Sequence, residues 1–144
     1  MALAIEEVTA ATQELAERLS VLVRQLSSST PEVSQAHLAA IVAAPAATLF
    51  TAVEDGRVLG MLTLVRYPIP TGWHWVIEDV VVDSAARGKG VAEALSRHAL
   101  AVAKAAGATA VNLTSRPSRE AANRLYQRLG FVRRETNVYR YGFD

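Results

Sequence analysis

The residues best suited to bind a ligand form a short glycine-rich segment, Arg87-Gly88-Lys89-Gly90. It follows an apolar run and precedes a stretch with helical spacing, so it is expected to join a strand to the start of a helix. The first N–H groups of a helix have no partner inside the helix and carry partial positive charge, which favours a bound phosphate. Glycine lets the backbone approach an anion closely, and the two cations add charge. An ordinary surface turn is the alternative interpretation of this segment alone.

Two familiar nucleotide-binding motifs do not fit the segment. A P-loop requires G-x-x-x-x-G-K-[ST], and no hydroxyl residue follows a Gly-Lys pair here. A dinucleotide fingerprint requires G-x-G-x-x-G/A, and Glu93 stands at the position of the third glycine. The segment therefore predicts phosphate binding without either of these motifs.

Two neighbouring carboxylates, Glu78 and Asp79, interrupt the apolar run that precedes the glycine-rich segment. A positioned carboxylate can take a proton from a nucleophile, and burial makes it a stronger base. Because side chains alternate along a strand, the two should point to opposite faces unless a bulge intervenes. We expect Glu78 to be a base, directly or through a water, with Asp79 as the second candidate. The alternative is a carboxylate at a strand end that only bonds loop amides.

Hydrophobic periodicity predicts the elements that position these residues. Helices are expected over residues 9–27, 30–43, 91–107 and 118–129. Strands are expected over residues 3–8, 46–53, 58–65, 73–82 and 109–114, and the tail over 131–143 alternates enough for one or two more. Thr30 and Pro31 are expected to start the second helix, and the prolines within residues 67–72 to form a loop. The order predicts one α/β domain, with a mixed, mostly antiparallel central sheet flanked by about four helices.

Composition excludes several classes of function. The chain has 144 residues, enough for one domain, and a formal net charge of +1, which argues against a nucleic-acid partner. It has no cysteine, which excludes a disulfide scaffold and a cysteine nucleophile. Its three histidines are far apart and lack a metal-binding spacing, so no metal is expected. The first residues do not read as a signal peptide and no run reaches the length of a membrane span, so we expect a cytoplasmic protein with no membrane partner.

Two motifs together resemble the GNAT superfamily of N-acetyltransferases. The family signature, Arg/Gln-x-x-Gly-x-Gly/Ala after a long apolar strand, is matched at every position by Arg87-Gly88-Lys89-Gly90-Val91-Ala92. A later Leu-Tyr pair followed by Gly-Phe is matched by Leu125-Tyr126 and Gly130-Phe131. The resemblance is sharp over about residues 73–131 and only topological over residues 1–72.

The resemblance implies a single acetyl-CoA-dependent N-acetyltransferase domain over residues 1–144. Backbone groups of Val80, Val81 and Val82 would pair with the pantetheine arm, and backbone N–H groups from Gly88 to Ala92 would hold the pyrophosphate. Tyr126 resembles the family's general acid, since a phenol with a pKa of about 10 is protonated at neutral pH. Many members carry an asparagine seven residues before this tyrosine, where this chain has Arg119. Either Asn123 serves instead or Arg119 reaches a coenzyme phosphate.

The expected reaction is acetyl transfer from acetyl-CoA to a primary amine by direct attack in a ternary complex, because no cysteine can carry an acetyl intermediate. A backbone N–H near Val80 would stabilise the oxyanion. The acceptor stays open between a small amine, an amino-sugar phosphate and a protein or peptide amine. A homodimer is a further expectation from the family.

Two other classes of function remain open from the sequence. A non-catalytic acyl-CoA-binding or sensing module would keep the glycine-rich segment and need neither acid nor base. A nucleotide-binding regulator would use the same segment to bind adenosine nucleotides without the pantetheine arm.

Overall fold

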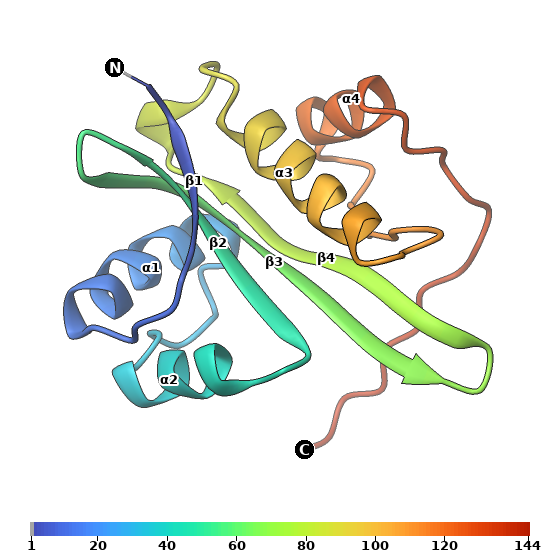
Figure 1. The fold of residues 1–144 in the computed structure, drawn as a ribbon, viewed down its shortest axis with the longest axis horizontal. Coiled ribbons are helices and arrows are strands. Elements are labelled where there is room, and N and C mark those ends of the chain that lie inside the picture. Colours follow the sequence, from blue (N-terminus) through green and yellow to red (C-terminus); the bar gives the residue numbers. More distant parts are fainter. Residues whose placement is uncertain (1) are drawn as a thin grey trace. The chain divides into compact units, whose positions relative to one another are not determined.

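The computed structural model describes residues 2–144. Its elements, in chain order, are β1 (Ala4–Glu7), α1 (Gln13–Leu26), α2 (Gln35–Ala43), β2 (Ala47–Glu54), β3 (Arg57–Ile69), β4 (Gly72–Val82), a 3₁₀ turn (Ser84–Ala86), α3 (Val91–Ala105) and α4 (Glu120–Arg128). They are drawn in Figure 1. The chain divides into two compact units, Met1–Thr114 and Ser115–Asp144, and each is described by itself.

The N-terminal unit is built on a four-stranded sheet in the order β1-β2-β3-β4, and each neighbouring pair is antiparallel. One parallel bridge joins Val76 of β4 to Asn112. The expected α/β class, with a mixed and mostly antiparallel sheet and four helices, is therefore confirmed.

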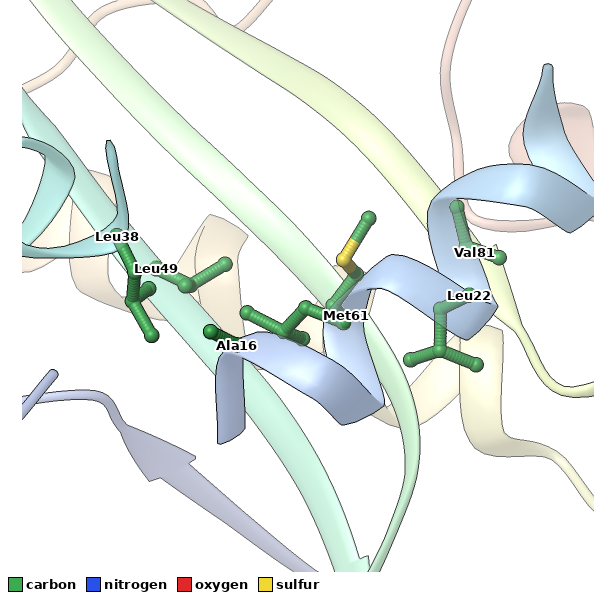
Figure 2. Packing of buried hydrophobic residues seen from close by; sticks show 7 residues of the cluster. Ala16, Leu22, Leu38, Leu49, Met61 and Val81 are labelled. Carbon is green, nitrogen blue, oxygen red and sulfur yellow. The ribbon is translucent and has the colours of Figure 1, made fainter. Parts of the chain in front are cut away.

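Helices cover both faces of this sheet. On one face, buried residues of α1 and α2 pack against strand side chains such as Leu49, Met61 and Val81 (Figure 2). On the other face lies α3 (Figure 1), whose His98 ring makes a T-shaped contact with the Phe50 ring, with ring centroids 4.9 Å apart. Leu49 and Phe50 are adjacent in β2 and so point to opposite faces. Strand alternation thus gives the unit two apolar layers, one on each face of the sheet. The end of β4 lies next to the start of α3.

The second helix begins later than the sequence suggested. Its N-cap is Ser34, whose hydroxyl accepts a hydrogen bond from the His37 N–H at 3.0 Å, and the predicted start at Thr30 is wrong. The reason is tertiary, because the buried Ser20 hydroxyl on α1 accepts the Val33 N–H at 2.8 Å. That bond holds the chain before Ser34 against α1 rather than in a helical turn.

The loop predicted over residues 67–72 is also wrong, because β3 and β4 continue as a long hairpin with a two-residue turn at Pro70 and Thr71. Beyond Val65, β3 has no partner in β2. The Arg66 N–H points away from β4, to the Ala46 carbonyl, and alternation points the Pro68 nitrogen the same way. Proline is tolerated there because no ladder bond needs its missing N–H.

The predicted strands after α3 do not form. Residues 109–114 contribute only the bridge between Asn112 and Val76 of β4. Just after Val76, β4 bulges, and a bulge bends a strand out of register with its neighbour. The tail over residues 131–144 has no strand in the C-terminal unit as described, and its large apolar side chains after Phe131 are exposed. Five polar residues over 133–137 interrupt the alternation, and this unit supplies no neighbouring strand to complete a ladder.

Candidate active site

The glycine-rich segment, hereafter the glycine loop (residues 87–90), leads directly into α3. Gly88 and Gly90 have φ of 82° and 76°, in the region that side chains avoid. Gly90 is the N-cap of α3, and among the described residues no side chain caps it. The expected site residue Val91 is buried at the first helical position, Ala92 follows it half-buried, and Arg87 and Lys89 are exposed. The loop therefore presents backbone N–H groups and two cations, as an anion site requires.

A β-bulge interrupts β4 at the two candidate carboxylates. Thr63 pairs with Glu78 and Met61 pairs with Val81. Between these two pairs β4 advances three residues while β3 advances two, so β4 carries one extra residue. Asp79 has φ of 50°, an uncommon value for a residue with a side chain. From the sequence, Glu78 and Asp79 are expected to point to opposite faces unless a bulge intervenes. The bulge is present, so simple alternation between faces does not apply to these two residues.

The bulge and the register decide which backbone groups face the outer edge of β4. The Ile77 N–H donates outward to Asn112, and the Asp83 N–H donates inward to the Leu59 carbonyl, at 2.9 and 2.8 Å. By alternation, Val81 faces β3, whereas Val80 and Val82 face the outer edge. Of the three valines expected to hold the pantetheine arm, two therefore have backbone groups available to an added strand, and Val80 lies in the bulge.

Glu78 and Asp79 are both exposed, so the burial that was expected to strengthen the base is absent. Glu78 lies on the same face of the hairpin as Tyr67 and His74, whose rings stack with centroids 5.6 Å apart. The His74 Nε2 also lies 3.0 Å from the Thr71 hydroxyl. An exposed carboxylate and an ordered aromatic and imidazole pair therefore share one face of the hairpin, four residues apart along β4.

The end of β4 is anchored by a network that sequence reasoning missed. Asp83 is buried, and its Oδ2 lies 2.6 Å from Nη2 of Arg18 on α1. Its Oδ1 accepts the Ala85 N–H at 3.1 Å and so caps the 3₁₀ turn that enters the glycine loop. These hydrogen bonds, that from Arg18 first, lower the pKa of Asp83 from 3.8 to about 2. The available signal was an N-cap residue, aspartate, placed just after an apolar strand.

A second missed residue, Gly60 of β3, sets the position of α3. A Cβ atom there would lie 2.9 Å from the Val81 carbonyl oxygen, 3.1 Å from a Val91 methyl group and 3.2 Å from a Leu95 methyl group. The first turn of α3 can rest on the sheet only because this residue has no side chain. A glycine inside a strand pattern is the sequence signal for such a close approach.

The C-terminal unit carries the other three candidate residues. Tyr126 is buried and its ring makes a T-shaped contact with the Phe131 ring, with centroids 5.7 Å apart. Burial raises the pKa of Tyr126, and the charge of Arg119 partly opposes the rise. The Asn123 amide donates to the carbonyls of Arg116 and Arg119, at 2.9 and 2.8 Å, and so orders the entry of α4. Tyr126 thus keeps its proton at neutral pH, and the Asn123 donors are already engaged.

Within residues 2–144, no group of three or more His, Asp or Glu side chains is placed to hold a metal ion. No helix of that range is long and apolar enough to cross a membrane.

Comparison with known proteins identifies the fold and the family. The acetyltransferase (GNAT) family model matches residues 12–131. An acetyltransferase-family protein of Agrobacterium tumefaciens is 30% identical, with a TM-score of 0.83 over 99% of this chain and 100% of that one. The chain belongs to the GNAT acetyltransferase family, a membership that implies acyltransferase activity, and the predicted resemblance is confirmed.

Two other solved structures share the architecture. A transcriptional regulator of Bacillus halodurans is 25% identical, with a TM-score of 0.84 over 98% of this chain and 100% of that one. The glucosamine-6-phosphate N-acetyltransferase of Arabidopsis thaliana is 19% identical, with a TM-score of 0.83 over the whole of both chains, and shows the fold alone. No curated protein sequence matches the chain significantly.

Proposed function

We propose that this protein transfers the acetyl group of acetyl-CoA to a primary amine by direct attack in a ternary complex. The observation that carries the proposal is the succession of a bulged edge strand, a glycine loop and a helix without a side-chain cap. These three features occur within fifteen residues of one another in a chain of the family that uses acetyl-CoA.

The coenzyme is held mainly by backbone groups in this proposal. The N–H groups from Gly88 to Ala92 bind the pyrophosphate. The side-chain charges of Arg87 and Lys89 attract the phosphates electrostatically, without hydrogen bonds of fixed geometry. The outward Val80 carbonyl and the outward backbone groups of Val82 bind the pantetheine arm in the manner of an added strand. Arg119, exposed at the start of α4, is the candidate for a further coenzyme phosphate, and Asn123 supports that segment.

The chemical step needs an oxyanion donor, a base and an acid. The bulge takes the Val80 N–H out of the ladder with β3, so this group is the proposed oxyanion donor. Glu78 takes the proton of the attacking amine, directly or through a water, since its carboxylate is exposed. As the amine attacks, the C–S bond breaks and Tyr126 donates its proton to the departing thiolate of coenzyme A.

The acceptor is proposed by class. Glu78 and the stacked pair of Tyr67 and His74 give one face of the hairpin a negative charge and a flat ring, which suits a small amine carrying a ring or a hydroxylated body. An amino-sugar phosphate fits this description and is the acceptor of the Arabidopsis relative in fold. A peptide amine remains a second acceptor class. We also propose a cytoplasmic location and a homodimer.

The test is calorimetric titration with acetyl-CoA, coenzyme A and ADP. We expect micromolar binding of acetyl-CoA and coenzyme A and loss of both in Gly90→Glu, because a side chain and a negative charge then occupy the anion site. Gly107→Glu is the matched control, since Gly107 also has positive φ and open space around it but lies at the far end of α3. Failure of the wild-type protein to bind any of the three ligands would overturn the proposal.

A second candidate function is a non-catalytic acyl-CoA-sensing module. The exposure of both carboxylates favours it, as does the likeness to a structure described as a transcriptional regulator. The two functions separate in an assay for free thiol with a panel of amines. Release of coenzyme A above the uncatalysed rate supports the enzyme, whereas tight binding without turnover supports the sensor.

A further inference from the structure

The segment that enters the glycine loop is held by a helix from a distant part of the chain. Arg18 and Gln25 are seven positions apart on α1 and so lie on one face of it, two turns from each other. Both reach the residues between the end of β4 and the loop. This contact is separate from the apolar face of α1, which packs on the sheet.

The contacts of Arg18 join two strands to the helix. Its Nε and Nη2 donate to the Val58 carbonyl at 2.9 and 2.6 Å, and Nη2 also lies 2.6 Å from Asp83 Oδ2. Arg57 adds a longer ion pair to the same carboxylate oxygen, at 3.9 Å. A planar guanidinium with fixed donors therefore sets where Asp83 stands relative to the start of β3.

Gln25 holds Ser84, the residue that follows Asp83, and also contacts Asp83 itself. Its Oε1 accepts the Ser84 N–H at 2.9 Å, and its Nε2 donates to Asp83 Oδ1 at 3.4 Å. Asp83 in turn caps the Ala85 N–H. The Ser84 and Ala85 N–H groups of the 3₁₀ turn are thus both held by side chains. The turn ends at Ala86, directly before the first residue of the glycine loop.

The exit of the loop is held as well, because Val91 packs on Gly60. The glycine loop is therefore a short glycine-rich stretch between two fixed ends. Glycines lose more conformational freedom on binding than other residues, so fixed ends lower the entropy that an anion must remove to order the loop.

We propose that Arg18 and Gln25 are positioning residues that hold the glycine loop ready for the pyrophosphate of coenzyme A. This inference rests on the function proposed above. It predicts that their loss weakens binding of ligands that contain the pyrophosphate and spares ligands that lack it. A residue that only stabilised the fold would weaken both.

The experiment is an NMR titration of the full-length ¹⁵N-labelled protein with coenzyme A and with pantetheine, which lacks the pyrophosphate. Amide signals of Gly88, Gly90 and Val82 report the loop and the strand. For Arg18→Met and Gln25→Leu we expect the Kd for coenzyme A to rise about tenfold and the Kd for pantetheine to change less than about twofold. The controls are Arg24→Met and Gln13→Leu, on the same helix, which contact only Glu32 and Glu17 through the bonds described.

Each outcome decides the inference. Wild-type affinity for coenzyme A in both variants overturns it, and so does an equal loss of affinity for coenzyme A and pantetheine. If Arg18→Met does not fold, Gln25→Leu carries the test, because Gln25 is exposed. A wild-type protein that binds coenzyme A no more tightly than pantetheine has no pyrophosphate site, which overturns the proposed coenzyme site itself before any variant is measured.

Discussion

Arg18 and Asp83 are 65 positions apart in the sequence, and their side chains meet through a contact of 2.6 Å between Nη2 and Oδ2. The carboxylate also caps the turn that leads into the glycine loop, and the Asp83 N–H donates to Leu59, so one buried residue connects α1, β3, β4 and the loop. A partly buried ion pair of this kind is costly to break from one side, because the remaining charge is left without its partner.

The first prediction concerns pH and Asp83. Its pKa is about 2 in the folded protein and 3.8 when unperturbed, so the carboxylate stays ionised in the folded state where the unfolded chain is protonated. Its stabilising effect is therefore present above about pH 4 and is lost as pH falls toward about 2. Asp83→Asn should lower the free energy of unfolding by about 2 kcal/mol at pH 7 in urea denaturation.

The same measurement at pH 3 should show a smaller difference between Asp83→Asn and the wild-type protein. Asp55→Asn, in the turn between β2 and β3, is the control and should be nearly neutral, because asparagine also tolerates the φ of 52° found there. An equal loss at pH 7 and pH 3 would show that the effect is not due to the ionised carboxylate.

The second prediction concerns Gly60. Gly60→Ala should lower the free energy of unfolding by about 1–3 kcal/mol, because the added carbon would stand 2.9 Å from the Val81 carbonyl oxygen and close to two side chains of α3. Gly142→Ala is the control, since nothing lies within 4 Å of a carbon added there. Thermal unfolding of the two variants checks this. Equal stability of both would contradict the packing of α3 on Gly60.

The third prediction separates the two carboxylates. Glu78→Gln should lower kcat by about tenfold or more once an acceptor is known, because it removes the proposed base. Asp79→Asn should keep kcat near the wild-type value, since asparagine tolerates the φ of 50° at this position and the bulge is preserved. Steady-state kinetics across pH checks both variants. The reverse order of effects would assign the base to Asp79.

The fourth prediction concerns the acid. Tyr126→Phe should lower kcat by about 100-fold while leaving the Kd for coenzyme A unchanged, because only the phenol proton is lost. Burial raises the pKa of Tyr126, so the wild-type kcat should stay constant with rising pH until above about pH 10 and then fall as the phenol ionises. Tyr139→Phe, at an exposed position of the same unit, is the control. A normal kcat in Tyr126→Phe would remove this residue from the mechanism.

Much of the framework followed from local sequence patterns. The strand before the glycine loop, the positive φ of its glycines and the start of α3 at Val91 all depend on short-range periodicity and on glycine's conformational freedom. The end of α3 near Gly107 was predicted for the same reason. Such signals lie within a few residues of the structure that they specify.

Other features were decided by contacts between distant segments. Ser20 on α1 moves the start of α2 to Ser34, and the outward direction of the Pro68 nitrogen lets β3 run through a segment that looked like a loop. The tail was predicted to form one or two strands but forms none, because a strand needs a neighbour and the sequence of the tail does not specify one.

The sequence by itself determined the family, the glycine loop and the candidate acid and carboxylates, because each is a short motif of residue types at set spacing. Only the tertiary structure decided that β4 bulges at Asp79, that both carboxylates are exposed, and that Arg18 holds Asp83. Register, burial and ion pairing are properties of two or more segments packed together, and no single segment carries the energies that set them.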